Sequence, residues 1–352
     1  MLIKSATKNY EITVHTDFEP VKKLEFDDKT FVVIDKTLYG LYADTIFSDI
    51  PKEKMYLLEA TEENKVIDTA LDICEILTNI SAKRNTKLIS FGGGIVQDVT
   101  GFVANILYRG IHWTFFPTTL LAGCDSCIGG KTSLNYKKFK NLLGTFYPPD
   151  RIFVCTPFFK TLSDRDFKSG LGEVVKFNVM HGEEGICNME NNIAKLLERE
   201  DNTLNRFVYS SLEFKKKFIE EDEFDKGIRI QLNFAHTFGH AFETVSEYEV
   251  PHGTAVAMGT IVANRISLSR GWMEKSDVER IENVLYKIIS VDKRNIDKPI
   301  SDILAAVRKD KKQIGDSLTA VLIKGKDMKL EIVHDVTENE IQTAIKYLME
   351  HI

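Results

Sequence analysis

The sequence contains little cysteine and no long apolar run, and both absences narrow what the protein can be. Its five cysteines are an odd, scattered set among 352 residues, which argues against a disulfide framework. Cys124 and Cys127 form a CxxC pair, but no second pair accompanies it, so ordinary thiols are favoured over a zinc or redox motif. No segment has the roughly 18 uninterrupted apolar residues of a membrane span, and the N-terminus lacks a signal-like run. We therefore expect a cytoplasmic protein without a membrane partner.

An excess of positive charge is also lacking. The formal net charge of -6 argues against a general nucleic-acid surface. An anionic small molecule is still a possible ligand, because the field inside a pocket depends on the few lysines and arginines that line it. The hydrophobic share of 43% is typical of a globular protein, and a chain of this length is expected to form two domains.

Short apolar runs alternate with helical patterns over residues 1–160. Such runs, bounded by polar or turn residues, are typical of buried parallel strands. One crossover helix is predicted over 66–80, where apolar residues keep helical spacing. We therefore predict an α/β fold whose N-terminal domain is Rossmann-like and has a mostly parallel sheet. The predicted strands are 30–35, 54–59, 87–91, 112–116 and 151–155.

Residues 161–352 have a different pattern, in which helical periodicity dominates. Ser163 and Asn202 are predicted N-caps, and a late hairpin is predicted from 319–325 and 329–333. We expect a second, mostly helical domain here. Its predicted helices are 163–180, 202–221, 233–243, 253–271 and 338–351.

A glycine-rich turn, FGGGIVQDVTGF, occupies residues 91–102, after a predicted strand and before a helix. Glycines at such a turn let the backbone approach a phosphate, and the helix N-terminus adds a favourable dipole. The run is not the GxGxxG fingerprint, however, and a tight strand-to-helix turn needs glycines for steric reasons alone. The two interpretations are evenly matched.

Polar residues are scattered through a segment rich in glycine and lysine, residues 109–149. Asp125, Lys131 and Asn141 are set among small and apolar neighbours, where burying an unpaired charge is costly. The alternative to a functional site is a solvated basic loop. A polar pocket for a hydroxylated, anionic ligand accounts better for these residues.

Potential ligands for a metal or substrate gather in two further motifs. Glu173 and Lys176 lie at i and i+3 among apolar residues, so a buried functional role is at least as plausible as an exposed ion pair. Two histidines four residues apart suggest a metal-binding pair, although a lone histidine is more often a core residue. One helical stripe would present four polar residues together, with His252 following: Arg229, Asn233, His236 and His240.

Taken together, these motifs resemble those of the 3-dehydroquinate synthases, a family of sugar-phosphate cyclases. The resemblance spans roughly residues 30 to 325 and includes GGGIVQDVTGF, PTTLLAGCDSCIGGKTSLN, KNLLGTFYPP, GLGEVVK, NFAHTFGHAFE and HGTAVAMG, in the family's order. It implies an NAD-binding domain, a helical domain with a catalytic Zn²⁺ or Co²⁺, and a homodimer. The implied substrate is a small sugar phosphate.

The resemblance also implies a role for each matching position. The metal ligands would be Glu173, His236 and His252. Substrate would contact Asp125, Lys131, Asn141, Lys176, Lys215, Arg229, Asn233 and His240, with Arg109 coming from the partner subunit and either Lys311 or Lys312 at the phosphate. NAD would contact Asp35, Glu62, Lys65, Gly93, Gly94, Ile95, Asp98, Thr118, Thr119, Lys131, Lys140, Phe158, Thr161 and Leu162.

The implied reaction is conversion of 3-deoxy-arabino-heptulosonate 7-phosphate to 3-dehydroquinate and phosphate, a step of the shikimate pathway. NAD would oxidise a hydroxyl acidified by the metal, phosphate would leave, NADH would return the hydride, and an intramolecular aldol step would close the ring.

Departures from the family pattern leave alternatives open. Gln97 and Ala235 stand where the family has glycine, and Cys124 and Cys127 flank Asp125. A specialised cyclase acting on an amino analogue or another sugar phosphate therefore stays possible. A metal- and NAD-dependent polyol dehydrogenase is a third reading, but it leaves the basic residues between Lys131 and Arg229 unexplained.

Overall fold

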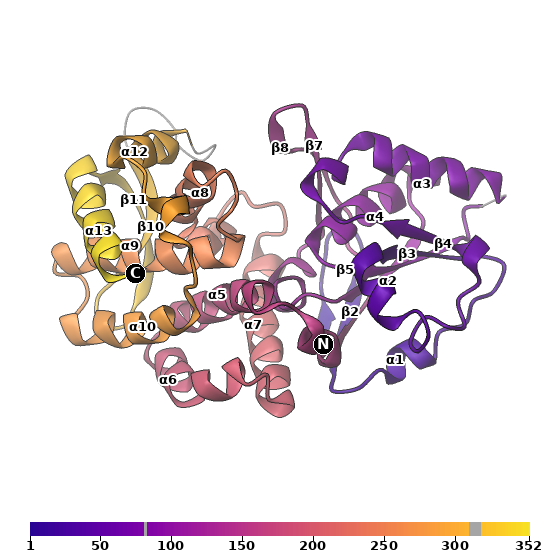
Figure 1. Ribbon diagram of the computed structural model, residues 1–352, viewed down its shortest axis with the longest axis horizontal. Coiled ribbons are helices and arrows are strands. Elements are labelled where there is room, and N and C mark those ends of the chain that lie inside the picture. Colours follow the sequence, from indigo (N-terminus) through magenta and orange to yellow (C-terminus); the bar gives the residue numbers. More distant parts are fainter. Residues whose placement is uncertain (81–82, 310–317) are drawn as a thin grey trace. The chain divides into compact units, whose positions relative to one another are not determined.

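The computed structural model describes residues 1–80, 83–309 and 318–352 (Figure 1). The chain forms two compact units. Unit 1 contains residues 1–161 and 204–212, and unit 2 contains residues 162–203 and 213–352. In the described part of the chain, no helix is both long enough and apolar enough to cross a membrane.

Unit 1 is built on a seven-stranded sheet with the order β1-β2-β9-β6-β5-β3-β4. Every neighbouring pair in it is parallel except β1 with β2. The predicted α/β fold with a mostly parallel sheet is therefore confirmed. The strands are β1 (Leu2–Ile3), β2 (Tyr10–His15), β3 (Thr30–Asp35), β4 (Met55–Leu58), β5 (Lys87–Gly92), β6 (His112–Pro117) and β9 (Arg151–Cys155).

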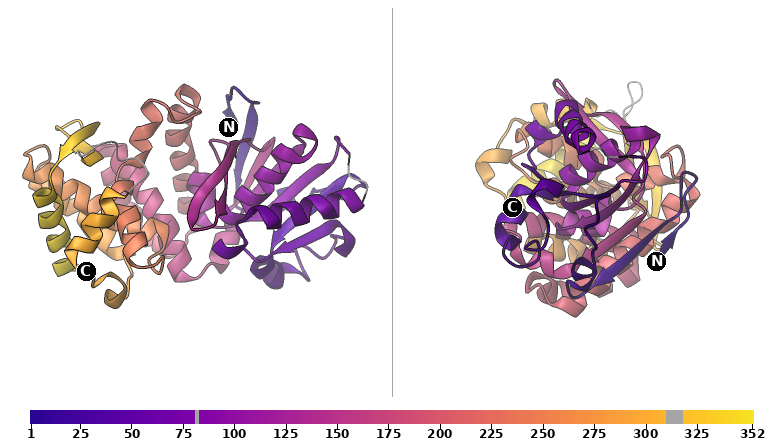
Figure 2. Two further views of the ribbon diagram at one scale, coloured as in Figure 1. Left: turned by 90° about the horizontal axis from the view of Figure 1, so that it is seen from above. Right: turned by 90° about the vertical axis from the view of Figure 1, so that its right-hand side faces the viewer.

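Helices pack on this sheet through apolar side chains. Helix α4 (Gly94–Ile106) contacts β3, β5 and β6 and buries Val96, Val99 and Val103. Helix α3 (Ile67–Asn79), which confirms the predicted crossover helix, packs against α4 (Figures 1 and 2). Two short helices, α1 (Glu19–Lys22) and α2 (Lys36–Tyr42), complete the unit with a hairpin of β7 (Lys131–Tyr136) and β8 (Phe139–Phe146). The sequence patterns did not predict this hairpin.

Unit 2 is mostly helical, as predicted, and its central helix is α9, which buries residues along nearly its whole length. The predicted late hairpin is confirmed as β10 (Leu318–Lys324) and β11 (Lys329–Val336). The helices that lie wholly or partly in unit 2 are α5 (Asp164–Met180), α6 (Glu183–Leu197), α7 (Asp201–Glu221), α8 (His236–Val245), α9 (His252–Ser269), α10 (Lys275–Ile288), α11 (Lys293–Ile296), α12 (Ile300–Arg308) and α13 (Glu338–His351).

Of the two predicted N-caps in unit 2, one is confirmed and one is wrong. Ser163 caps α5 by accepting a hydrogen bond from the Asp166 backbone, as expected. The side chain that caps α7, however, is that of Glu200 and not Asn202, because α7 begins at Asp201.

The predicted single helical stripe from Arg229 to His240 is wrong. Residues Ile228–Asn233 form a separate 3-10 helix, and Ala235 then adopts a left-handed conformation with φ of 70° before α8 begins at His236. Left-handed backbone interrupts the i to i+4 hydrogen bonds of an α-helix, so Arg229 and Asn233 lie in the 3-10 helix while His236 and His240 lie in α8.

Candidate active site

Helices α5 and α9 cross closely at two glycines. A Cβ atom on Gly172 would overlap the backbone of Gly253, and one on Gly253 would overlap the carbonyl of Ser169. The Ser169 hydroxyl oxygen also accepts a hydrogen bond of 3.0 Å from the Gly253 backbone nitrogen. Since Glu173 and His252 are the chain neighbours of these glycines, the crossing brings their side chains together.

Helices α8 and α9 make a second close crossing. A Cβ atom on Gly259 would overlap the carbonyl oxygen of Ala235, and one on Gly239 would lie 3.1 Å from the carbonyl oxygen of Ala255. This crossing brings the first turns of α8 and α9 together. The ring centroids of His236 and His252 are consequently 5.3 Å apart.

The two crossings gather Glu173, His236 and His252 into one cluster. One Glu173 carboxylate oxygen, Oε1, lies 3.4 Å from Nε2 of His236 and 3.2 Å from Nε2 of His252. The potential ligand atoms of the three residues all lie within 4.8 Å of one another. Glu173 is fully buried, yet neither of its oxygens has a well-directed hydrogen bond within the described chain.

Both imidazoles are oriented by contacts on their other nitrogen. Nδ1 of His236 lies 3.0 Å from the Phe234 carbonyl oxygen, and Nδ1 of His252 lies 3.3 Å from a Glu243 carboxylate oxygen. An acceptor at Nδ1 places the imidazole proton there and leaves the Nε2 lone pair for a cation. Two such nitrogens and a buried carboxylate are the donor set that Zn²⁺ takes in catalytic sites. The three residues therefore fit a divalent metal.

Lys176 provides the positive charge beside this cluster. Its ammonium group lies 2.6 Å from Oε2 of Glu173 and donates a 3.1 Å hydrogen bond to the Leu232 carbonyl oxygen. The exposed fraction of Lys176 is only 2%. The pair of Glu173 and Lys176 is therefore buried and is not an exposed surface ion pair.

Burial and neighbouring charges displace the pKa values of the cluster. Burial raises the pKa of Glu173, but the charge of Lys176 and the contacts with His252 and His236 together outweigh burial and hold that pKa well below its ordinary value. Burial, aided by Lys176, holds the pKa of His236 well below its ordinary value, which keeps the ring neutral as a metal ligand must be. Burial also opposes protonation of His252, but the charges of Glu243 and Glu173 outweigh it and raise its pKa to about 10.

His240 lies one turn after His236 on α8 and borders the cluster. Its ring centroid is 5.4 Å from that of His236 and 6.1 Å from that of His252. It groups with Glu243 and His252 rather than with Glu173. The remaining predicted substrate residues of this unit are elsewhere: Lys215 is buried on α7, Arg229 is buried in the 3-10 helix, and Asn233 ends that helix.

In unit 1, residues predicted to contact NAD lie where parallel strands end. Asp35 is the last residue of β3, and its side chain caps α2 by accepting hydrogen bonds from the backbone N–H groups of Thr37 and Leu38. Gly93 links β5 to α4, and Thr118 follows β6 and donates its backbone N–H to Gly92. Because β6, β5 and β3 are adjacent and parallel, their carboxyl ends share one edge of the sheet, which is where α/β folds bind ligands.

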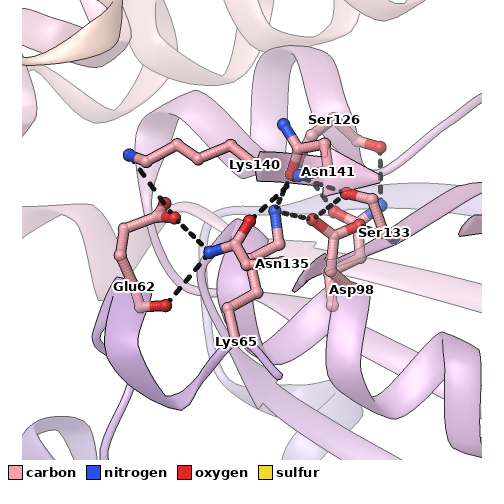
Figure 3. A network of polar contacts seen from close by, with 9 residues as sticks. Glu62, Lys65, Asp98, Ser126, Ser133, Asn135, Lys140 and Asn141 are labelled. Atoms are coloured by element: carbon pink, nitrogen blue, oxygen red, sulfur yellow. Dashed lines mark hydrogen bonds and ion pairs between the residues drawn. The ribbon is translucent and has the colours of Figure 1, made fainter. Parts of the chain in front are cut away.

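A polar network joins this edge to the hairpin of β7 and β8 (Figure 3). Lys65 is buried, 2.5 Å from an Asp98 carboxylate oxygen and 2.7 Å from the amide oxygen of Asn141. Burial raises the pKa of Asp98, and the attraction of Lys65 only partly offsets this. The Asn135 amide donates to both the backbone and the carboxylate of Glu62, and Lys140 lies 3.5 Å from that carboxylate.

Several predicted residues are not drawn into these clusters. Arg109 lies beyond the C-terminal end of α4, whose thirteen residues separate it by roughly 20 Å from the glycine turn. Phe158 is fully buried among aromatic side chains, and Thr161 donates its hydroxyl to the Phe158 carbonyl. The Leu162 carbonyl accepts from Arg199. Lys311 and Lys312 lie outside the described residues.

The sequence patterns missed several residues that organise the two regions. Ser133 and Asn135 hold Asp98 and Glu62, and Ser126 holds Gln97. No periodic pattern marks these residues, because the sequence KTSLNY of β7 has no regular alternation of polar and apolar residues. All five cysteines are free thiols, as predicted, and Cys124 and Cys127 are buried.

The fold has known counterparts. The structure of 2-epi-5-epi-valiolone synthase from Streptomyces hygroscopicus subsp. jinggangensis, with NAD⁺ and Zn²⁺ bound, matches with a TM-score of 0.84 at 22% identity, covering 97% of each chain. A 2-deoxy-scyllo-inosose synthase in complex with carbaglucose-6-phosphate, NAD⁺ and Co²⁺ matches with a TM-score of 0.81 at 23% identity, covering 99% of this chain and 98% of the other. The protein thus has the fold of the sugar-phosphate cyclases.

Sequence comparison narrows the class. Residues 55–169 match the model of the 3-dehydroquinate synthase N-terminal domain, and residues 170–313 match that of the C-terminal domain. A 3-dehydroquinate synthase of Clostridium tetani is 37% identical over 345 residues, which cover 96% of this chain and 92% of that protein. The chain therefore belongs to the 3-dehydroquinate synthase family.

Proposed function

We propose that the protein is a 3-dehydroquinate synthase, a lyase that converts 3-deoxy-arabino-heptulosonate 7-phosphate to 3-dehydroquinate and phosphate. The observation that carries the proposal is the convergence of Glu173, His236 and His252 in a chain of this family. We place it in the shikimate pathway on the same ground. Five free thiols fit a cytoplasmic location, where cysteines stay reduced.

The metal in this proposal is Zn²⁺ or Co²⁺, and the redox cofactor is NAD. The proposal is supported by the donor atoms of the cluster and by the ligands named for the two structures of like fold. When bound, the cation supplies Lewis acidity toward substrate hydroxyls, and NAD accepts and returns a hydride. Glu173, His236 and His252 would hold the cation, and Glu243 would fix the ring of His252 through Nδ1.

For NAD we propose the carboxyl edge of the sheet in unit 1. Gly93 and Gly94 stand at the start of α4, where backbone N–H groups and the helix dipole favour a pyrophosphate. The Asp35 carboxylate at the end of β3 suits a ribose hydroxyl. The other proposed contacts are Glu62, Lys65, Ile95, Asp98, Thr118, Thr119, Lys131, Lys140, Phe158, Thr161 and Leu162.

The substrate carries a phosphate, a carboxylate and several hydroxyls, and the chain's own residues suit these groups. Lys131, Lys176, Lys215 and Arg229 would neutralise the two anionic groups, because charge-assisted hydrogen bonds fix orientation strongly. Asp125, Asn141 and Asn233 would accept from or donate to hydroxyls. His240 borders the metal ligands without belonging to the Glu173 group, so we assign it to substrate and to proton movement at the reacting carbon.

We also propose a homodimer in which Arg109 of the partner subunit completes the phosphate site. The position of Arg109 beyond the far end of α4 supports this assignment. Subunit complementation tests it. Coexpressed Arg109→Ala and His252→Ala subunits should regain up to about one quarter of wild-type activity, because half of a random mixture is heterodimer and one of its two sites is intact. A mixture as inactive as its parents would show that Arg109 does not act across subunits.

Turnover is the direct test of the proposed function. The purified protein with NAD⁺ and Zn²⁺ should release phosphate and dehydroquinate in equal amounts from the heptulosonate phosphate, with no net NADH. A panel that includes the amino analogue and other sugar phosphates, read by product mass, separates this activity from a specialised cyclase. Net NADH formation from a simple polyol, without phosphate release, would favour a dehydrogenase instead.

A further inference from the structure

Gln97 makes a reciprocal pair of hydrogen bonds with Ser126. Its side-chain amide nitrogen donates to the Ser126 carbonyl oxygen at 2.7 Å, and the Ser126 hydroxyl donates to the Gln97 amide oxygen at 2.8 Å. Gln97 lies on α4 and is only 4% exposed. Its amide is therefore held in a buried position, where hydrogen bonds meet little competition from water.

Asp98, the next residue on α4, anchors Ser133, which lies seven residues after Ser126 in the chain. The carboxylate of Asp98 accepts from both the backbone N–H of Ser133, at 3.0 Å, and the Ser133 hydroxyl, at 3.1 Å. Figure 3 draws Ser126, Ser133 and Asp98 in one network of polar contacts. Adjacent residues of one helix thus tie down both ends of residues 126–133.

The backbone from Ala122 to Gly130 is irregular. Residues Ala122–Ser126 form a π-helical turn, a rare form often found at functional sites. Gly129 and Gly130 follow with positive φ values of 100° and 64°, and glycines allow many backbone conformations. The Gly129 backbone N–H donates to the Tyr10 hydroxyl at 2.9 Å, so contacts from outside the stretch hold it at its glycine end as well as at Ser126.

The two residues that we assign to substrate in this stretch sit beside its anchors. Asp125 directly precedes Ser126, and Lys131 begins β7 two residues before Ser133. A shift of Ser126 therefore displaces Asp125, and a loosened turn gives Lys131 more positions to occupy. Orientation of this kind is a large part of substrate binding and catalysis.

We propose that Gln97 is a positioning residue, which acts through Ser126 to hold Asp125 and Lys131 in place for the sugar phosphate. The inference rests on the proposed function and adds a residue to its machinery. Both hydrogen bonds come from the side chain of Gln97. A glycine at position 97 would make neither of them.

Hydrogen exchange tests the anchor without turnover. We compare Gln97→Met, which keeps the side-chain volume but loses both hydrogen bonds, with the wild-type protein loaded with NAD⁺ and Zn²⁺. Peptides covering 122–133 should exchange about tenfold faster in Gln97→Met, the factor expected for the loss of one to two hydrogen bonds. Exchange in α9 should stay unchanged. Gln342→Met, on α13 of unit 2, is the matched control and should alter neither region.

Kinetics separates positioning from a role in packing alone. In Gln97→Met the KM for the heptulosonate phosphate should rise about tenfold, and NAD⁺ affinity should fall by a smaller factor, because Asp125 is assigned to substrate alone while Lys131 is assigned to both. Ser126→Ala should act in the same direction, and the double variant should be no worse than Gln97→Met, because both changes remove one linkage. Unchanged exchange, or faster exchange with an unchanged KM, would overturn the proposal. An inactive wild-type protein would refute the proposed function, whereas the exchange comparison would still decide the anchor.

Discussion

The two polar regions of the molecule are built in opposite ways. In unit 2, close crossings of α5, α8 and α9 press two imidazoles against the buried Glu173 carboxylate, which pairs with Lys176 but has no well-directed hydrogen bond from any described residue. In unit 1, a hairpin surrounds Asp98 with hydrogen bonds from Ser133 and an ion pair with Lys65. The Glu173 carboxylate, which is short of hydrogen bonds, lies beside two imidazole nitrogens that can bind a cation together with it. The well-satisfied carboxylate holds parts of the fold together and positions its neighbours.

The largest effect is expected from removing a metal ligand. His236→Ala and His252→Ala should each lose bound Zn²⁺, measured by elemental analysis, and at least about a thousandfold in kcat/KM. His240→Ala should retain the metal and lose turnover alone. If His240→Ala also lost the metal, His236 and His240 would both be metal ligands, and the assignment of Glu173 as a ligand would be wrong.

The glycine crossings should be nearly as sensitive. Gly172→Ala places a Cβ against the backbone of Gly253, so we expect a loss of about 3 kcal/mol in the free energy of unfolding, together with weaker metal binding. Denaturant unfolding measures the first and chelator competition the second. Gly40→Ala in α2 is the matched control: its Cβ would meet nothing within 4 Å, and it should stabilise the protein by up to about 1 kcal/mol.

A change in the hairpin network should affect unit 1 alone. Asp98→Asn keeps a side chain of the same shape but leaves buried Lys65 without its carboxylate. We expect a loss of about 3 kcal/mol in stability and weaker binding of NAD⁺, measured by titration calorimetry, with unchanged Zn²⁺ content. Loss of the metal in this variant would mean that the two regions do not act separately.

The contact between Glu243 and His252 should tune the metal site without destroying it. In Glu243→Gln the carboxylate that fixes Nδ1 of His252 is replaced by a neutral amide. Zn²⁺ affinity should fall roughly 10- to 100-fold, and Glu243→Asp should recover part of the loss. Glu350→Gln, at an exposed position of α13, should bind Zn²⁺ as the wild type does. Equal affinities for Glu243→Gln and Glu350→Gln would contradict the role.

The smallest effect is expected at Ala235, whose φ of 70° is unfavourable for a residue with a side chain. Ala235→Gly should relieve this strain, although the more flexible unfolded chain offsets part of the gain. We expect stability to rise by less than about 1 kcal/mol, with metal content unchanged. A clear loss of stability would show that the buried methyl group contributes more by packing than it costs in backbone strain.

Local patterns predicted the helices α3, α5, α9 and α13 and the strands β3, β5, β6 and β9, but not α6, α10 and α12 or the hairpin of β7 and β8. The four strands are continuous apolar runs, and such runs are recognisable without knowledge of their partners. The hairpin has no regular alternation of polar and apolar residues and contains several lysines, so its sequence also fits a solvated loop. Its strands pair with each other, and Asn135 bonds to Lys65 and Glu62 far back in the chain.

By itself, the amino-acid sequence determined the fold class and the family, because apolar periodicity and ordered motifs are local properties, and the family resemblance implied that Glu173, His236 and His252 share a metal. The tertiary structure brings these three side chains together, and it alone showed that Ala235 separates the 3-10 helix from α8 and that Gln97 bonds to Ser126. The metal-ligand cluster and the Gln97 contact each depend on segments far apart in the chain approaching within a few ångströms. Such an approach is governed by glycine crossings and by strand pairing, which no local pattern specifies.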